Sequence, residues 1–173
     1  MSELSFGIRD EMGDDGAAVD AVLVRAFGGR GEAELVAALR RERHVAVSLV
    51  ATVDRAVVAH LLFSRLQIFR PGNVDAGLSL APLAVDPAFQ RRGIGSALVR
   101  AGLDRARAVG ERIVFVLGDP GYYGRFGFSA EAAMGFECVY ACEALQAIVL
   151  DGDWPGAAKG KVVYPPPFAA LGE

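Results

Sequence analysis

Residues 83–100 of the chain, LAVDPAFQRRGIGSALVR, decide how the rest of the sequence is interpreted. A short apolar run is followed by a turn, a loop with two glycines and the start of an amphipathic helix. Such a loop leaves backbone N–H groups unpaired at the positive end of a helix dipole, which favours a bound anion, typically a phosphate. Gly93 and Gly95 let the anion approach the backbone, and Arg91 and Arg92 add positive charge.

Two common phosphate motifs do not fit this loop. The dinucleotide fingerprint needs a third glycine where the chain has Leu98, and the P-loop needs a lysine that is absent here. The segment Gln-Arg-Arg-Gly-Ile-Gly instead resembles the pyrophosphate loop of the GNAT superfamily of acyl-CoA-dependent N-acetyltransferases, Gln/Arg-x-x-Gly-x-Gly/Ala. The alternative is an ordinary tight glycine turn between a strand and a helix.

The resemblance implies that acetyl-CoA binds as co-substrate at this segment. The residues expected to contact it are Leu83, Ala84, Val85, Arg91, Arg92, Gly93, Ile94, Gly95 and Ser96. Pro82 lies in the strand before the loop, and a proline cannot donate a ladder hydrogen bond, so it predicts either the strand's start or a bulge. In the resembled superfamily a bulge here opens a wedge for the pantetheine arm, and a backbone N–H beside it stabilises the reaction's oxyanion.

A second motif, Tyr-Tyr-Gly-Arg-Phe-Gly-Phe over residues 122–128, resembles the superfamily's Tyr-x-x-x-Gly-Phe. Tyr123 has the matching spacing, and by that resemblance its phenol serves the departing thiolate as general acid, with Tyr122 as the fallback. The alternative is that both tyrosines are half-buried packing residues. The asparagine that many members carry seven residues before the tyrosine is Val116 here.

The hydrophobic periodicity predicts an α/β domain of the α+β type. Helices are expected at residues 16–27, 32–43 and 94–109, and strands at 4–9, 45–53, 56–69, 74–85 and 112–117. Short strands are expected near residues 135–141, 147–150 and 161–164, and an irregular tail from the prolines at 165–167. The strand–helix–strand unit at 74–117 gives a parallel pair in a mixed sheet. The resemblance implies the GNAT fold, with six or seven strands, a V-shaped split at the centre and about four helices.

Composition narrows the classes of function. A chain of 173 residues suits a single domain over residues 1–173, and a net charge of −3 argues against nucleic-acid binding. No signal peptide or membrane-spanning run is recognised, and two cysteines are too few for a disulfide framework or a zinc site. We therefore expect a cytoplasmic protein without a membrane partner or a metal; a homodimer is left open.

The expected reaction is transfer of an acetyl group from acetyl-CoA to a primary amine, on a small molecule or a peptide, by direct attack in a ternary complex. The alternative is a non-catalytic acyl-CoA-binding sensor or regulatory module. The sequence identifies neither the amine, nor the general base, nor whether other acyl groups are used. His60 lies in an apolar strand, which favours a core side chain over a base. Glu131 and Glu137 follow the second motif and are candidates to line the acceptor end of the site, with deprotonation of the amine through water as the alternative.

Overall fold

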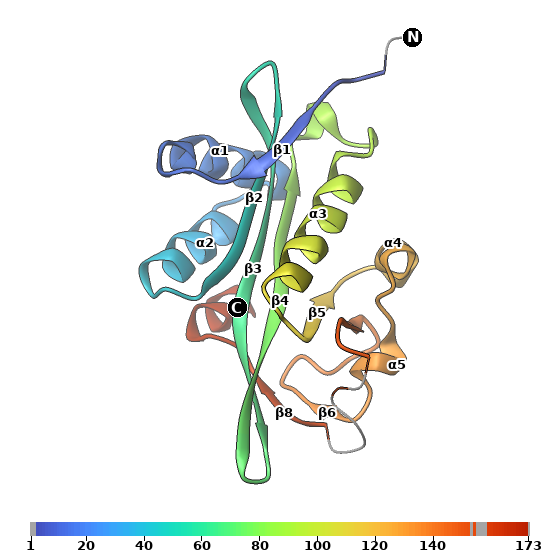
Figure 1. The fold of residues 1–173 in the computed structure, drawn as a ribbon. Helices are drawn as coiled ribbons and strands as arrows, with labels where there is room; N and C mark the ends of the chain where they lie inside the picture. Colours follow the sequence, from blue (N-terminus) through green and yellow to red (C-terminus); the bar gives the residue numbers. More distant parts are fainter. Residues whose placement is uncertain (1–2, 153, 155–158, 173) are drawn as a thin grey trace.

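The computed structural model describes residues 3–152, 154 and 159–172, and it shows a mixed sheet with helices on both faces (Figure 1). The main path through the sheet runs in the order β1-β2-β3-β4-β5-β7. These strands are β1 (Gly7–Asp10), β2 (Val45–Val53), β3 (Ala56–Arg70), β4 (Asn73–Val85), β5 (Ile113–Leu117) and β7 (Leu145–Val149). Two short strands, β6 (Phe136–Glu137) and β8 (Gly160–Val163), pair with each other, and β8 also pairs with β3.

Helices α1 (Gly16–Phe27) and α2 (Gly31–Arg41) cover one face of the sheet, and α3 (Ile94–Ala108) covers the other (Figure 1). The division follows the two-residue period of the strands. Leu49 and Leu61 pack with the buried face of α3, whereas their neighbours Val50 and Leu62 pack with α1 and α2. Among the described helices, none has the length and apolarity needed to cross a membrane.

The fold class predicted from the sequence is confirmed, with some differences in count. The helix over residues 16–27 and the strand over 45–53 have the predicted bounds. The described residues form eight strands rather than six or seven, because the two-residue β6 and the four-residue β8 join the sheet. They form five α-helices rather than about four, because α4 (Pro120–Tyr123) and α5 (Ala130–Ala133) are single turns.

The chain's last part differs from the irregular tail that we predicted. Residues Pro166–Gly172 form a 3-10 helix, η4, beside α2. Phe168 is buried there among residues of α1 and α2. The buried ring of Phe168 thereby anchors a segment whose sequence has no hydrophobic periodicity of its own.

Strand β4 is irregular in its second half, beyond Ser79. It pairs in parallel with β5 only at Leu78 and Ser79, after which the two strands separate. In its pairing with β3, the register moves from Leu80 opposite Phe63 to Leu83 opposite Leu61, so β4 carries one extra residue around Pro82. The predicted bulge and the split at the centre of the sheet are therefore both present, and β4 beyond Ser79 has no partner strand on its β5 side.

Candidate active site

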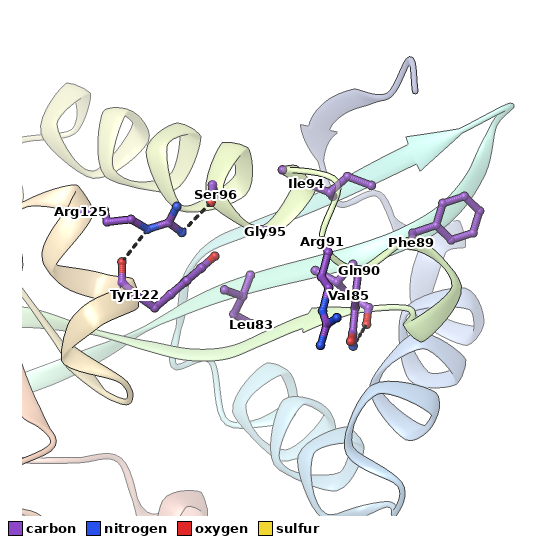
Figure 2. A pocket seen from close by; sticks show the side chains of 11 residues that line it. Leu83, Val85, Phe89, Gln90, Arg91, Ile94, Gly95, Ser96, Tyr122 and Arg125 are labelled. Atoms are coloured by element: carbon purple, nitrogen blue, oxygen red, sulfur yellow. Dashed lines mark hydrogen bonds between the residues drawn. The ribbon is translucent and has the colours of Figure 1, made fainter. Parts of the chain in front are cut away.

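The two sequence motifs meet at one cavity of about 470 Å³, which we call the loop cavity (Figure 2). It lies between the end of β4, the loop after it, the first turn of α3 and the turn α4. Seven of the nine residues predicted to contact a cofactor line it: Leu83, Val85, Arg91, Gly93, Ile94, Gly95 and Ser96. Ala84 does not, because alternation along β4 directs it to the opposite face with α1 and α2. Arg92 does not either, and its guanidinium lies 5.8 Å from the centre of the Phe89 ring.

The loop presents the open N-terminus of α3 to this cavity. Gly93 precedes the helix with φ of 83°, a left-handed conformation that favours glycine, and Arg91 also has a positive φ of 63°. No side chain of the described residues caps α3. The N–H groups of its first turn, at residues 94–96, therefore point along the positive end of the helix dipole toward the cavity.

Gln90, the first residue of the loop motif, has a structural role that the sequence did not reveal. Its side-chain amide donates a hydrogen bond of 3.0 Å to the carbonyl oxygen of Val85, closing the loop onto the end of β4 (Figure 2). Asp86 holds the other side of the loop: it accepts from the N–H of Ala88 at 3.0 Å and pairs with Arg25 of α1 at 2.8 Å. These contacts hold the loop against the end of β4 and against α1.

Arg125 is a second site residue that sequence reasoning missed. Its guanidinium lies 4.7 Å from the centre of the Tyr122 ring and donates a hydrogen bond of 3.1 Å to the hydroxyl of Ser96 (Figure 2). It therefore bridges the second motif and the first turn of α3 across the cavity. The sequence shows a basic residue inside the Tyr-x-x-x-Gly-Phe motif, but it does not show that this residue contacts Ser96, which lies 29 positions away in the chain.

The two tyrosines of the second motif occupy different places. Asp119 caps α4 by accepting from the N–H of Gly121 at 2.9 Å, and the turn that follows directs Tyr122 into the loop cavity. Tyr123 does not line that cavity. Its ring packs against Gly118, just beyond β5, and against the ring of Phe128 at 5.8 Å. Burial, with a smaller contribution from Tyr122, raises the pKa of Tyr123 to about 12.

The residues considered as bases lie away from the loop cavity. His60 is fully buried opposite Val50 and Ala84, with its Nε2 atom 2.9 Å from the Ser48 hydroxyl and 3.5 Å from Glu11. Burial lowers the pKa of His60, and the hydrogen bond with Glu11 opposes that shift.

The remaining side chains that the sequence raised as candidates are not among those that line the loop cavity. Glu131 and Glu137 are exposed beyond the second motif. Val116, at the position where many members of the superfamily have an asparagine, is buried and packs in the apolar core under α3. Cys138 and Cys142 are free thiols. Within the described ranges, no three His, Cys, Asp or Glu side chains gather as metal ligands.

The split mixed sheet and the phosphate-type loop on its central strand define the class, which comparison with known proteins confirms. The chain belongs to the acetyltransferase (GNAT) family of acyltransferases, whose model matches residues 18–128. It is 41% identical over 128 residues to the uncharacterized N-acetyltransferase YjhQ of Escherichia coli K12, covering 72% of this chain and 68% of that protein. It is 37% identical over 132 residues to the uncharacterized N-acetyltransferase YhbS of the same strain, covering 76% and 78%.

Solved structures of similar proteins share the whole architecture. The crystal structure of Escherichia coli YhbS in complex with CoA has a TM-score of 0.89 at 34% identity, covering 98% of this chain and 94% of that one. A GNAT acetyltransferase from Brucella melitensis in complex with acetyl-CoA has a TM-score of 0.79 at 35% identity, covering 95% and 98%. The fold and the family expected from the two motifs are therefore confirmed.

Proposed function

We propose that this protein transfers the acetyl group of acetyl-CoA to a primary amine by direct attack in a ternary complex. One observation carries the proposal: the loop cavity joins a phosphate-type loop to the end of β4, where that strand no longer pairs with β5. The complexes of YhbS with CoA and of the Brucella protein with acetyl-CoA support this choice of cofactor.

The loop cavity suits the pyrophosphate and the pantetheine arm of acetyl-CoA. The pyrophosphate would accept hydrogen bonds from the N–H groups of residues 94–96, with Arg91 and Arg125 supplying positive charge. The amide groups of the pantetheine arm would pair with β4 at Leu83 and Val85, where that strand has no partner on its β5 side. An extended ligand would thereby take the place of a missing strand.

Attack of an amine on the thioester forms a tetrahedral intermediate with a negatively charged oxygen. A backbone N–H of β4 beside the bulge is the donor that we assign to this oxyanion. Collapse of the intermediate breaks the carbon–sulfur bond and expels the CoA thiolate, and the proton that the attacking amine loses passes to water. Tyr123 lies at the end of β5, next to the gap. With its pKa raised to about 12, Tyr123 remains protonated and assists as a hydrogen-bond donor to the sulfur rather than by complete proton transfer. Tyr122, which lines the loop cavity, is the second candidate for this role.

The proposal is tested by release of CoA from acetyl-CoA in the presence of amines. The panel of amines contains polyamines, amino acids, aminoglycosides, peptides with a free N-terminal amine and simple aralkylamines. A series of acyl-CoA donors of different chain length measures the preference for the acetyl group. We expect amine-dependent CoA release and an N-acetylated product by mass spectrometry. Tight acetyl-CoA binding without release for any amine would contradict the proposal and favour the sensor or regulatory module.

A further inference from the structure

A second cavity, of about 280 Å³, opens where β4 and β5 separate, and we call it the gap cavity. Its lining includes Ser79, Leu80 and Ala81 of β4 and Leu117 at the end of β5. The loop cavity reaches the same strand farther along, at residues 83 and 85. The two cavities therefore meet β4 before and after its bulge.

The loop cavity lies on the face of the sheet that α3 covers, and the gap cavity lies mainly on the other face, with Leu80 alone of its described lining residues in the core under α3. Leu83 and Val85 pack with the core under α3. Ala81, Tyr164 and Phe168 pack with the core under α1 and α2. A thioester held along β4 from the loop cavity would thus be open to attack from the gap cavity.

We infer that the gap cavity receives the amine, and that the acceptor carries its amine on a compact apolar or aromatic body without a carboxylate or a second ammonium group. This inference rests on the proposed function. It goes further by assigning the chemical class of the acceptor.

The walls of the gap cavity offer mainly apolar surface. Three aromatic rings stand in a row, with 4.7 Å between the ring centres of Tyr140 and Tyr164 and 5.2 Å between those of Tyr164 and Phe168. The Tyr140 hydroxyl donates a hydrogen bond to the carbonyl oxygen of Phe168 at 3.4 Å. Among the described residues, those that line this cavity include no charged side chain.

Such walls select against charge on the body of the acceptor. A carboxylate or a second ammonium group brought here would lose its hydration and find no opposite charge, which is a large penalty. A single ammonium group is attracted to aromatic ring faces, so the substrate can enter. Desolvation then lowers the pKa of the amine, which favours the neutral nucleophile without a dedicated base.

The volume of the gap cavity limits the size of the acceptor's body. At about 280 Å³ it is roughly twice the 150 Å³ cavity that binds benzene in an engineered protein core. One aromatic ring with a short aminoalkyl chain fits that space. An aminoglycoside does not.

The inference is tested by comparing kcat/KM for three amines at saturating acetyl-CoA. 2-Phenylethylamine and phenylalanine share a ring and an amine and differ by one carboxylate, and spermidine has several ammonium groups and no ring. We expect 2-phenylethylamine to exceed each of the others by about 100-fold or more, because the rejected charges would be buried without partners.

A substitution in the lining tests whether the preference among amines arises in the gap cavity. Leu117 lines it and is 41% exposed, so Leu117→Glu adds a carboxylate at its edge without disturbing the core. We expect the preference for 2-phenylethylamine over spermidine to fall by at least about tenfold while acetyl-CoA affinity stays unchanged. The matched control, Val109→Glu, adds the same charge beyond α3 at a residue that is 72% exposed, and should keep the wild-type preference.

The possible failures are distinguishable. A wild-type preference for spermidine or phenylalanine would overturn the inference and leave the proposed function standing. An unchanged preference in Leu117→Glu would overturn the assignment to the gap cavity. Acetyl-CoA binding without turnover of any amine would overturn the proposed function, and the inference with it.

Discussion

Replacing Tyr123 with phenylalanine removes one hydroxyl and keeps the ring. The ring packs against Gly118 and Phe128, so the variant should fold and bind acetyl-CoA as the wild type does. Because burial raises the pKa of Tyr123 to about 12, the hydroxyl carries its proton over the whole working pH range and can donate to the leaving sulfur. We expect the substitution to act on the chemical step and not on cofactor binding.

The size of the effect follows from the type of hydrogen bond. A neutral donor to a charged acceptor in a partly desolvated site contributes about 1.5–3 kcal/mol. If that stabilisation is present only when the thiolate forms, its loss slows the chemical step about 10- to 150-fold. Tyr122→Phe should have a smaller effect, since Tyr122 is five residues before Gly127, one residue farther than the motif requires.

The assay is a single-turnover measurement of acetyl transfer, which isolates chemistry from product release. Calorimetric titration with acetyl-CoA serves as the control for binding. A Tyr123→Phe variant with the wild-type single-turnover rate would refute the role of its hydroxyl. If Tyr122→Phe alone were slow, the role would belong to the tyrosine that lines the loop cavity.

Three further predictions concern affinity and stability. Arg125→Ala should weaken acetyl-CoA binding severalfold, and Arg125→Lys should restore only part of it because stacking on the tyrosine ring is lost, as calorimetry would show. Gly102→Ala places a Cβ 2.6 Å from a methyl group of Leu61, so urea unfolding should show a loss of about 1–3 kcal/mol, less any gain in helix propensity. A hydrogen bond from Arg9 lowers the pKa of Asp15 to about 2, so its contribution to stability is present above pH 3.8 and lost toward pH 2. In a plot of the urea unfolding midpoint against pH, Arg9→Gln should reduce the fall of the midpoint between pH 3.8 and pH 2. An unchanged fall would contradict the assignment.

The sequence predicted best those features that depend on neighbouring residues. The helix at α1 and the strand β2 have clear hydrophobic periods and clear end signals, and both were located to the residue. The loop before α3 was recognised because its glycines and arginines are contiguous. Pro82 indicated the bulge because a proline restricts backbone pairing wherever it occurs.

Features formed by distant residues could not be predicted in the same way. Arg125 reaches Ser96 only because α4 folds against the first turn of α3. The gap cavity is built from β4, β5 and residues near the C-terminus, among them Tyr164 and Phe168. Their aromatic character was visible in the sequence, but their meeting point is set by packing of η4 beside α2.

The central claim is that the loop before α3 binds acetyl-CoA through its backbone. Calorimetric titration of acetyl-CoA into the wild type and Gly95→Val tests it most directly, because a Cβ at Gly95 would lie 3.0 Å from the Tyr122 hydroxyl and 3.5 Å from Val85, within the loop cavity. Gly16→Val, a glycine in the first turn of α1 with open space around it, is the matched control. The account predicts tight binding to the wild type and the control, with none detectable in a folded Gly95→Val protein. Unchanged affinity in Gly95→Val would contradict it.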